Sequence, residues 1–242
     1  MKVIVIIPAA GLGTRMASTP RPKNKQATPS KQFTELGGIP ILIHTLRKFA
    51  ASPEVAEIFV ALRTSEIGGF RNLLEKEGKE ILREKTELIE GGEHRQESVA
   101  RALAAVRAAP EDIVIVHDAV RPLVSQEIIQ DVIDAAKKYG AAIAGLPAVD
   151  TVKQVERTAQ GAVITATISR ERVVLAQTPQ GFRYDVLKKA FDEAAGDGFM
   201  GTDEASLVER SGYEVAVVMG STRNIKITTA ADMELAEFFL TR

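Results

Sequence analysis

A glycine-spaced turn that carries one arginine follows the first apolar run of the chain. Residues 8–16 read PAAGLGTRM, with Gly11 and Gly13 two positions apart and Arg15 two positions further on. Glycine permits close backbone approaches, successive N–H groups can then face an anion, and arginine offers a planar charge to phosphate oxygens. The turn matches neither the G-x-G-x-x-G dinucleotide fingerprint nor the Walker A loop. It therefore predicts a phosphate-binding loop of another kind, with a tight strand-to-helix turn and a surface arginine as the alternative.

Basic residues and prolines continue directly after this turn. Residues 18–30 are rich in Pro, Lys and Thr, and we interpret them as a mobile loop over the site. Most charges in such a run are ordinarily solvated. Spacing alone therefore leaves open whether Lys23, Lys25 or Lys31 contacts an anion.

A second polar loop, GGEHRQES, follows another apolar run. Gly91 and Gly92 precede a predicted helix whose opening turns contain Arg95 and Ser98. N–H groups and a hydroxyl at a helix start can bind phosphates or bases. A Gly-Gly turn with a polar first helical turn is the simpler alternative.

The third loop, VHDAVRP, places Asp118 at the end of a wholly apolar run. A carboxylate beside a phosphate-binding loop commonly holds Mg²⁺, which prefers oxygen ligands and bridges phosphates, although an ion pair with Arg121 is the alternative. The chain offers no paired catalytic carboxylates, no Ser-His-Asp order and no cysteine nucleophile beside this one metal candidate. This combination favours phosphoryl or nucleotidyl transfer, in which positioning and charge neutralisation supply most of the catalysis.

Alternating strands and helices must position these loops. Short β-branched runs predict strands at Val3–Ile7, Ile58–Leu62, Glu87–Glu90, Ile113–Val116 and Ala142–Leu146. Helical spacing predicts helices at Ile41–Ala50, Phe70–Arg83, Arg95–Ala108 and Gln126–Tyr139. The alternation predicts an α/β fold, a Rossmann-like and mostly parallel sheet with helices on both faces. Ligands of such sheets bind outside the carboxyl ends of the strands, where the three polar loops would meet.

One segment breaks the alternation. Period-two alternation in Ala162–Ile168 and a turn near Gly161 predict a long hairpin over about residues 149–170. Because two strands are only marginally stable alone, we expect a protruding β-arm that packs on a second subunit. The tail predicts a final amphipathic helix, with Thr229 and Asp232 at capping-box spacing.

The composition excludes several classes of protein. The chain has 45% hydrophobic and 26% charged residues and a net charge of −1, which gives no bulk attraction to nucleic acid or to a membrane. It has no cysteine, so disulfides and thiolate metal sites are excluded. The first apolar run is too short for a transmembrane helix, and no signal-peptide centre follows it. We expect a cytoplasmic protein, and its length allows one large domain or two small ones.

The motifs together resemble the 2-C-methyl-D-erythritol 4-phosphate cytidylyltransferase family of the non-mevalonate isoprenoid pathway. The resemblance covers essentially the full length, with the markers in family order: PAAGLGTRM (8–16), GGEHRQESV (91–99), VHDAVRP (116–122), DTVK (150–153), SRERVVLAQTPQGF (169–182), TDEAS (202–206) and NIKIT (224–228). It implies transfer of CMP from CTP to methylerythritol phosphate with release of pyrophosphate. It also implies a Rossmann-like fold, a homodimer joined through the β-arm, and Mg²⁺ or another divalent cation as cofactor.

The resemblance implies a role for each matching residue. Arg15 and Lys31 correspond to cations that stabilise the triphosphate, and Lys226 is similar to the lysine at the reacting α-phosphate. Asp118 corresponds to the aspartate that holds Mg²⁺ and the substrate. CTP binding is implied for Pro8, Ala9, Ala10, Gly11, Gly13, Gly91, Gly92, Arg95 and Ser98. Binding of methylerythritol phosphate is implied for Asp118, Arg121, Thr151, Thr202 and, from the partner's arm, the residue at the position of Arg170.

Two features depart from the family pattern. The connection from Met16 to Lys31 is longer than the family usually has, which leaves Lys23 and Lys25 as rivals of Lys31. Val174 stands where the family often has an aromatic residue. Ribitol-5-phosphate cytidylyltransferase and a non-catalytic CTP-binding protein are the alternatives to this function, whereas a dehydrogenase would need a glycine fingerprint that the chain lacks.

Overall fold

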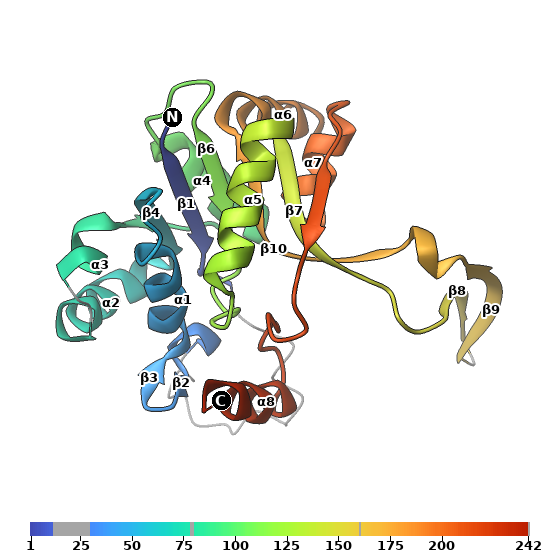
Figure 1. Cartoon of the computed structure of the whole chain (residues 1–242), viewed down its shortest axis with the longest axis horizontal. Coiled ribbons are helices and arrows are strands. Elements are labelled where there is room, and N and C mark those ends of the chain that lie inside the picture. The colour runs from blue at the N-terminus through green and yellow to red at the C-terminus, as the bar shows by residue number, and fades with distance from the viewer. Residues whose placement is uncertain (12–29, 78–79, 160, 242) are drawn as a thin grey trace.

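A seven-stranded sheet forms the centre of the computed structural model, which describes residues 1–11, 30–77, 80–159 and 161–241 (Figure 1). In spatial order its strands are β11 (Ala216–Met219), β7 (Ala141–Pro147), β10 (Val174–Arg183), β6 (Ile113–Val116), β1 (Val3–Pro8), β4 (Val55–Leu62) and β5 (Thr86–Glu90). Neighbouring strands are parallel except at β10, which runs antiparallel to both β6 and β7. The predicted α/β fold with a mostly parallel sheet is therefore confirmed.

The alternation of side chains along β1 divides the core between the two faces of the sheet. Val3, Val5 and Ile7 belong to one apolar cluster, and Ile4 and Ile6 belong to the other. The first face is covered by α1 (Ile41–Ala50), α2 (Thr64–Glu77), α3 (Glu80–Lys85) and α5 (Gln126–Tyr139). The second face is covered by α4 (Arg95–Ala105), α6 (Tyr184–Asp197) and α7 (Glu204–Arg210). Because β1 is buried on both faces, its sequence is a continuous apolar run.

A small subsidiary layer lies beyond one edge of this core. It contains the 3₁₀ turn η2 (Lys31–Phe33), the short strands β2 (Glu35–Leu36) and β3 (Ile39–Pro40), and the final helix α8 (Ala230–Leu240) (Figure 1). Leu36, Ile41, Ile227 and Ala236 bury one another there. The layer therefore brings the segment that begins at Lys31 beside the segment that precedes α8. The capping box predicted at the start of α8 is present.

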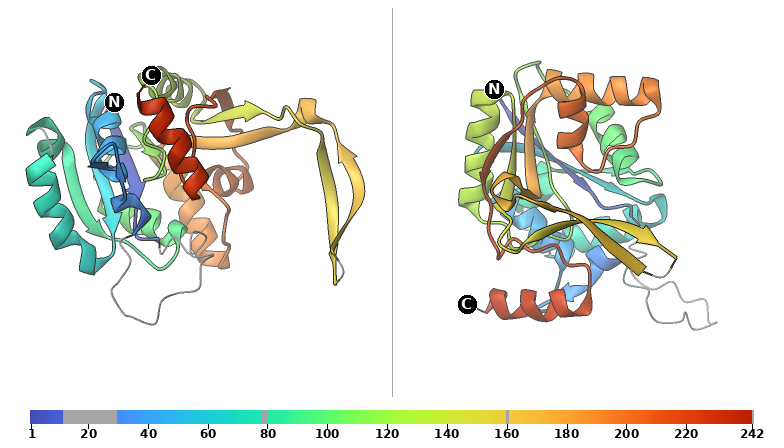
Figure 2. Two further views of the ribbon diagram at one scale, coloured as in Figure 1. Left: turned by 90° about the horizontal axis from the view of Figure 1, so that it is seen from below. Right: turned by 90° about the vertical axis from the view of Figure 1, so that its right-hand side faces the viewer.

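The predicted β-arm is also present. Strands β8 (Val152–Thr158) and β9 (Gly161–Ile168) pair antiparallel and extend well away from the rest of the described chain (Figure 2). A short 3₁₀ turn, η3 (Arg170–Arg172), follows at the base of the arm. Every residue of β9 is exposed, including Val163, Ile164 and Ile168.

Some predicted elements differ from the observed ones. The single helix expected over Phe70–Arg83 is wrong, since α2 ends at Glu77 and α3 begins at Glu80. Residues 78–79 lie outside the described residues, and their sequence includes a glycine, which disfavours a helix interior by about 1 kcal/mol. The elements β10, β11, α6 and α7 have no counterpart among the predicted ones. Within the described residues, no helix combines the length and apolar character that a membrane crossing requires.

Candidate active site

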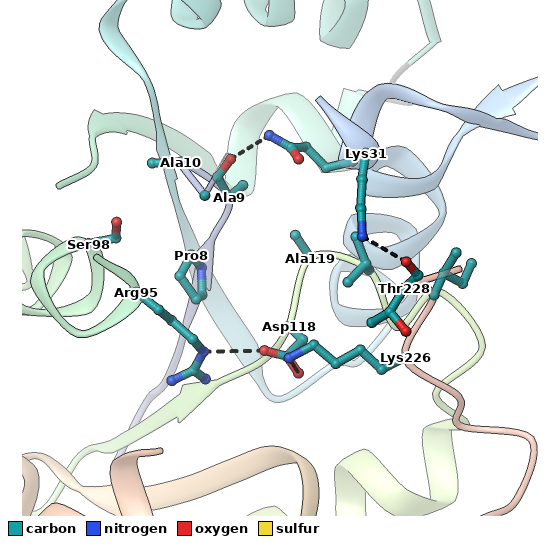
Figure 3. A pocket seen from close by; sticks show the side chains of 14 residues that line it. Pro8, Ala9, Ala10, Lys31, Arg95, Ser98, Asp118, Ala119, Lys226 and Thr228 are labelled. Atoms are coloured by element: carbon teal, nitrogen blue, oxygen red, sulfur yellow. Dashed lines mark hydrogen bonds and ion pairs between the residues drawn. The ribbon is translucent and has the colours of Figure 1, made fainter. Parts of the chain in front are cut away.

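Loops from separate strands meet at one edge of the sheet. The parallel strands β1, β5 and β6 end in the PAAG, GGEHRQES and HDAVR segments, so their carboxyl ends point to the same side. A cavity of about 180 Å³ lies there (Figure 3). It is lined by Pro8, Ala9, Ala10, Gly11, Lys31, Gln32, Arg95, Ser98, Asp118, Ala119, Val120, Lys226, Ile227 and Thr228. The convergence expected from the sequence is therefore observed.

Asp118 is the only acidic residue among the described residues that line the cavity, and it is nearly buried. Its Oδ1 lies 3.3 Å from Nε of Arg95, and its Oδ2 lies 2.9 Å from Nζ of Lys226 and 3.2 Å from Nε of Arg121. The backbone N–H of Asp118 donates to Oγ1 of Thr178 at 3.0 Å. The ion pair with Arg121 that the sequence left open does form, and two further cations share the same carboxylate.

These contacts set the protonation state of Asp118. Burial by itself raises the pKa of a carboxyl group, because it penalises the charged form. Here the charges of Arg95, Lys226 and Arg121 outweigh burial and hold the pKa of Asp118 well below its usual range. The adjacent His117 is fully buried, and burial lowers its pKa to about 4. At neutral pH the site therefore contains an ionised Asp118 beside a neutral His117.

Two lysines from opposite ends of the chain line the same cavity. Lys31 lies in η2, and its ammonium donates to the carbonyl oxygen of Thr228 at 2.8 Å. Lys226 lies two residues before Thr228 and pairs with Asp118 (Figure 3). The other candidates of the basic stretch, Lys23 and Lys25, lie outside the described residues, as do Gly13 and Arg15.

The two glycine-containing loops touch each other beside the cavity. A Cβ atom at Gly91 would lie 2.5 Å from Cβ of Ala10 and 3.0 Å from Oγ of Ser98, so a side chain at this position has no room. The hydroxyl of Ser98 accepts from the N–H of Gly92 at 3.0 Å and donates to the carbonyl of His94 at 3.1 Å. Gly91 and Gly92 therefore shape the cavity without lining it, while Ser98 both lines it and fixes the loop.

Two candidate residues of the site were not evident in the sequence. The amide of Gln32 donates to the carbonyl of Ala9 at 2.5 Å. Arg63 follows β4, another parallel strand, and donates to the carbonyl of Ala10 at 3.1 Å and to Oγ of Ser30 at 2.5 Å. These two side chains hold the start of the first loop against the segment that begins at Ser30. The rule that ligands bind at the carboxyl ends of parallel strands could have indicated Arg63.

Three of the expected substrate-binding residues lie away from this cavity. Thr151 and Arg170 are exposed at the base of the β-arm, where the Arg170 guanidinium donates to the carbonyl of Val149 at 2.7 Å. Thr202 is exposed in the segment before α7. Arg121 does not line the cavity, but it contacts Asp118 and donates to the carbonyl of Asn224 at 2.7 Å. Within the described part of the chain, no group of three or more His, Cys, Asp or Glu side chains forms a metal site.

The described lining of this cavity is cationic apart from one carboxylate, and the cavity lies at the carboxyl edge of an α/β sheet beside a loop of small residues. Nucleotidyltransferases use sites of this kind. The chain belongs to the IspD family, 2-C-methyl-D-erythritol 4-phosphate cytidylyltransferase, which it matches over residues 3–242. The enzyme class and family expected from the motifs are therefore confirmed. Ribitol-5-phosphate cytidylyltransferase and a non-catalytic CTP-binding protein are not favoured.

Individual relatives agree with this assignment. The chain is 56% identical over 240 residues to the 2-C-methyl-D-erythritol 4-phosphate cytidylyltransferase of Acidobacterium capsulatum, covering 99% of this chain and 98% of the relative. It is 43% identical to that of Geobacter metallireducens, covering 99% and 98%. Among solved structures, the Francisella tularensis enzyme of the same name superposes with a TM-score of 0.80 at 36% identity, covering 98% and 99% of the two chains. The Thermus thermophilus enzyme superposes with a TM-score of 0.75 at 34% sequence identity, covering 100% of both chains.

Replacement of Asp118 by Asn tests the charge balance of the cavity. Three cations would lose their shared counter-charge, so the free energy of unfolding should fall by roughly 3 kcal/mol. This value is at the low end of the cost of breaking a buried ion pair, because Lys226 is partly exposed. Since the folded-state pKa of Asp118 is lowered, its stabilisation is fully present above the ordinary carboxyl pKa of about 3.9 and is lost only as the pH falls further. The difference in free energy of unfolding between wild type and Asp118→Asn, measured by urea unfolding, should therefore stay the same from about pH 5 to pH 8.

Asp192→Asn is the matched control, because Asp192 pairs with Lys188 on the exposed face of α6. It should change stability little. Equal stability of Asp118→Asn and wild type at pH 7 would contradict the charge balance described above.

Proposed function

We propose that the chain transfers CMP from CTP to 2-C-methyl-D-erythritol 4-phosphate, giving 4-diphosphocytidyl-2-C-methyl-D-erythritol and pyrophosphate. A phosphate oxygen of the alcohol phosphate attacks the α-phosphorus of CTP. The bond from that phosphorus to the oxygen bridging the β-phosphate breaks, and pyrophosphate leaves in line. The observation that carries the proposal is the cavity itself, in a chain of this family. Among its described lining residues Lys31, Arg95 and Lys226 are cationic, and Arg95 and Lys226 pair with Asp118, the one acidic residue.

The chemistry of this transfer suits the residues present. A phosphate nucleophile is already ionised at neutral pH, so no protein base has to remove a proton. The main requirement is to position the reacting groups and to neutralise charge on the α-phosphate and the leaving pyrophosphate. Lys226 and Lys31 are the described lysines that line the cavity, and Arg15 would add to them from the first loop. We assign the catalytic role to these three side chains.

The small residues of the first loop leave room for the nucleotide. Ala9, Ala10 and Gly11 line the cavity on one side, and Ser98 lines it from α4 (Figure 3). Pro8 and Gly13 complete the first loop, and Gly91 and Gly92 hold the second loop against it. We propose that these residues bind CTP, with Arg95 at its phosphates or ribose.

The donor set fits Mg²⁺ or another divalent cation that binds together with CTP. Mg²⁺ in nucleotide enzymes is usually held by one or two carboxylates and by substrate phosphates, so a single protein carboxylate is enough. The lowered pKa of Asp118 keeps this carboxylate ionised at neutral pH. Asp118 would hold the cation, which would neutralise phosphate charge when bound.

The exposed β-arm supports a homodimer in which each arm completes the partner's site. Its apolar side chains Val155, Val163, Ile164 and Ile168 are 40% to 60% exposed, an unusual concentration for two strands that protrude alone. Thr151 and Arg170 lie at the base of the arm, away from their own cavity. We propose that Arg170 binds the alcohol phosphate in the partner's site, together with Asp118, Arg121 and Thr202 of that subunit. Thr151, which the family resemblance grouped with the last two, lies at the base of the arm like Arg170, so we propose that it acts in the partner's site as well. We also propose that residues 1–242 form one nucleotidyltransferase domain and that the protein is cytoplasmic.

The Lys226→Ala variant tests the function and the role of the lysine together. Wild-type protein should release pyrophosphate from CTP only when methylerythritol phosphate and Mg²⁺ are both present. The variant should lower kcat by about 100-fold or more, as loss of a charge partner of the transition state typically does. A coupled pyrophosphate assay measures both rates.

The matched control is Lys137→Ala, since Lys137 pairs with Glu54 away from the cavity. It should retain the wild-type rate. A wild-type rate in Lys226→Ala would refute the role of that lysine, and faster turnover with ribitol 5-phosphate would refute the substrate.

Mixing two inactive variants tests whether the arm acts in trans. Lys226→Ala and Arg170→Ala chains should each be impaired, but a mixed dimer holds one site with an intact Lys226 and an intact arginine from its partner. Equal mixing should restore up to about a quarter of wild-type activity, since half of the dimers are mixed and each has one complete site. The two variants are refolded together or left to exchange subunits. The pyrophosphate assay then measures the recovered activity.

Recovery needs a dimer, so Ile164→Asp on the arm should abolish it and should shift the sedimentation coefficient toward that of one chain. Ile81→Asp is the control, because Ile81 is similarly exposed on α3, far from the arm. No recovery in the mixture of two dimeric variants would contradict the assignment of Arg170 to the partner's site.

A further inference from the structure

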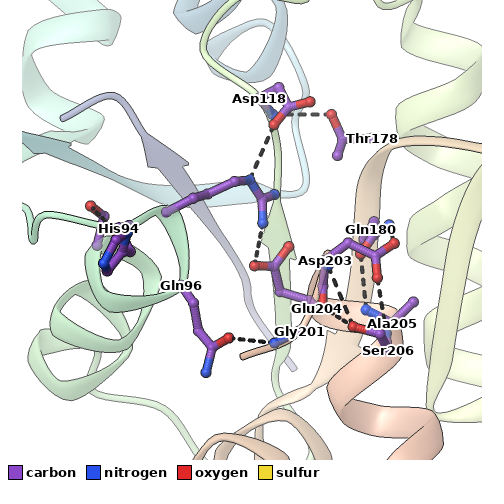
Figure 4. Close-up of polar contacts among 12 residues, drawn as sticks. His94, Gln96, Asp118, Thr178, Gln180, Gly201, Asp203, Glu204, Ala205 and Ser206 are labelled. Atoms are coloured by element: carbon purple, nitrogen blue, oxygen red, sulfur yellow. Dashed lines mark hydrogen bonds and ion pairs between the residues drawn. The ribbon is translucent and has the colours of Figure 1, made fainter. Parts of the chain in front are cut away.

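Glu204 is a carboxylate that the proposed chemistry does not use, although it is 1% exposed and lies close to the site. It is the first residue of α7, two positions after Thr202. The neighbouring backbone is fixed on both sides (Figure 4). Asp203 caps the helix by accepting from the N–H of Ser206 at 3.0 Å, and Gln180 donates to Asp203 at 2.8 Å and accepts from the N–H of Ala205 at 3.1 Å. The Glu204 side chain therefore starts from a rigid position.

The carboxylate of Glu204 holds Arg95. Its Oε1 accepts from Nη1 of Arg95 at 2.6 Å, while Nε of the same guanidinium lies 3.3 Å from Oδ1 of Asp118. The planar guanidinium thus spans two carboxylates, one on α7 and one after β6. With both ends bound, Arg95 has little freedom to leave the cavity wall that it lines.

The next residue of α4 makes a second link to the same segment. Oε1 of Gln96 accepts from the N–H of Gly201 at 2.8 Å, and its amide donates to the carbonyl of Phe199 at 3.0 Å. Residues 199–204 therefore dock on the start of α4 through two successive side chains, Arg95 and Gln96. This arrangement joins the segment that carries Thr202 to the helix that carries Ser98.

Stability alone does not explain a carboxylate at position 204. Burial raises the pKa of Glu204, and the opposing attraction of Arg95 does not overcome it. Among the described residues, Oε2 of Glu204 has no hydrogen-bond partner at all. A glutamine would fill nearly the same volume without the cost of a buried charge. The charge is therefore better explained by what it does to Arg95.

We propose that Glu204 is a positioning residue for CTP binding, which fixes the Arg95 guanidinium between α7 and Asp118. The inference rests on the proposed function, since Arg95 is assigned there to CTP. Glu204 does not touch the nucleotide. It holds Arg95 in its binding position before CTP arrives, so that ordering this long side chain costs no affinity.

Glu204→Gln is the test, because it removes the charge and keeps the shape. The KM for CTP should rise about tenfold, the scale of one lost charge-assisted hydrogen bond, while kcat stays within about threefold of wild type. The midpoint of thermal unfolding should fall only slightly, because Arg95 keeps its second carboxylate partner, Asp118. Glu54→Gln is the control, since Glu54 pairs with Lys137 and Gln130 away from the cavity, and its KM should equal that of wild type.

A double-mutant cycle then asks whether Glu204 acts through Arg95. In an Arg95→Met background, Glu204→Gln should leave the KM for CTP unchanged and should raise the thermal midpoint, because the buried carboxylate has lost its partner. A wild-type KM in Glu204→Gln would overturn the proposal. The proposal would also be overturned if Glu204→Gln raised the KM for CTP in the Arg95→Met background as much as it does in wild type.

Direct titration of CTP separates this inference from the proposed function. If the wild-type protein binds CTP but does not convert methylerythritol phosphate, the proposed function fails. The Kd for CTP, measured by calorimetry, then replaces the KM as the test of Glu204. Glu204→Gln should then weaken the Kd for CTP about tenfold. An unchanged Kd would overturn the positioning role even when turnover is normal.

Discussion

The shared ion pairs of Asp118 are the interaction on which the site depends. One nearly buried carboxylate joins α4 through Arg95, the loop after β6 through Arg121, and the segment before α8 through Lys226. These segments are far apart in the sequence, and without the carboxylate their charges would repel one another. Among the described residues that line the cavity, Lys31, Arg95 and Lys226 are cationic and Asp118 alone is acidic, which gives a surplus of positive charge. A triphosphate is the kind of ligand that such a surplus favours.

The sheet makes this meeting of charges possible. Strands β1, β4, β5 and β6 run parallel, so their loops end at one edge, while the strictly alternating core positions of β1 anchor helices on both faces. The antiparallel strand β10 adds Thr178, whose hydroxyl accepts from the backbone N–H of Asp118. The position of the carboxylate is thus set by backbone as well as by charge.

Local sequence patterns predicted much of this arrangement. The apolar runs predicted the strands. Because ligands bind outside the carboxyl ends of parallel strands, the strands in turn predicted the sheet edge where Asp118, Arg95 and Ser98 meet. The β-arm followed from its period-two alternation. Lys226 came from resemblance to the family, because nothing in its spacing connects it to a carboxylate more than 100 positions away. The assignments of Thr151, Arg170 and Thr202 stay predictions, since a single chain does not bring them to the cavity.

Residues that act through long-range side-chain contacts could not be predicted. Gln32 and Glu204 each bind a group distant in sequence, and no periodicity or motif marks such a contact. Elements with weak local signals were missed for a related reason. The strand β10 lies between two others and is defined by its neighbours, so tertiary context decides its conformation.

A titration of the Asp118 side chain tests the central claim most directly. Carbon-13 NMR can follow its carboxyl resonance against pH, with the spectrum of Asp118→Asn identifying the signal. We predict that the resonance keeps its ionised position from about pH 8 down to about pH 4, since the folded-state pKa lies well below the ordinary value of about 3.9. A midpoint at or above that ordinary value would contradict the claim that three cations share this carboxylate.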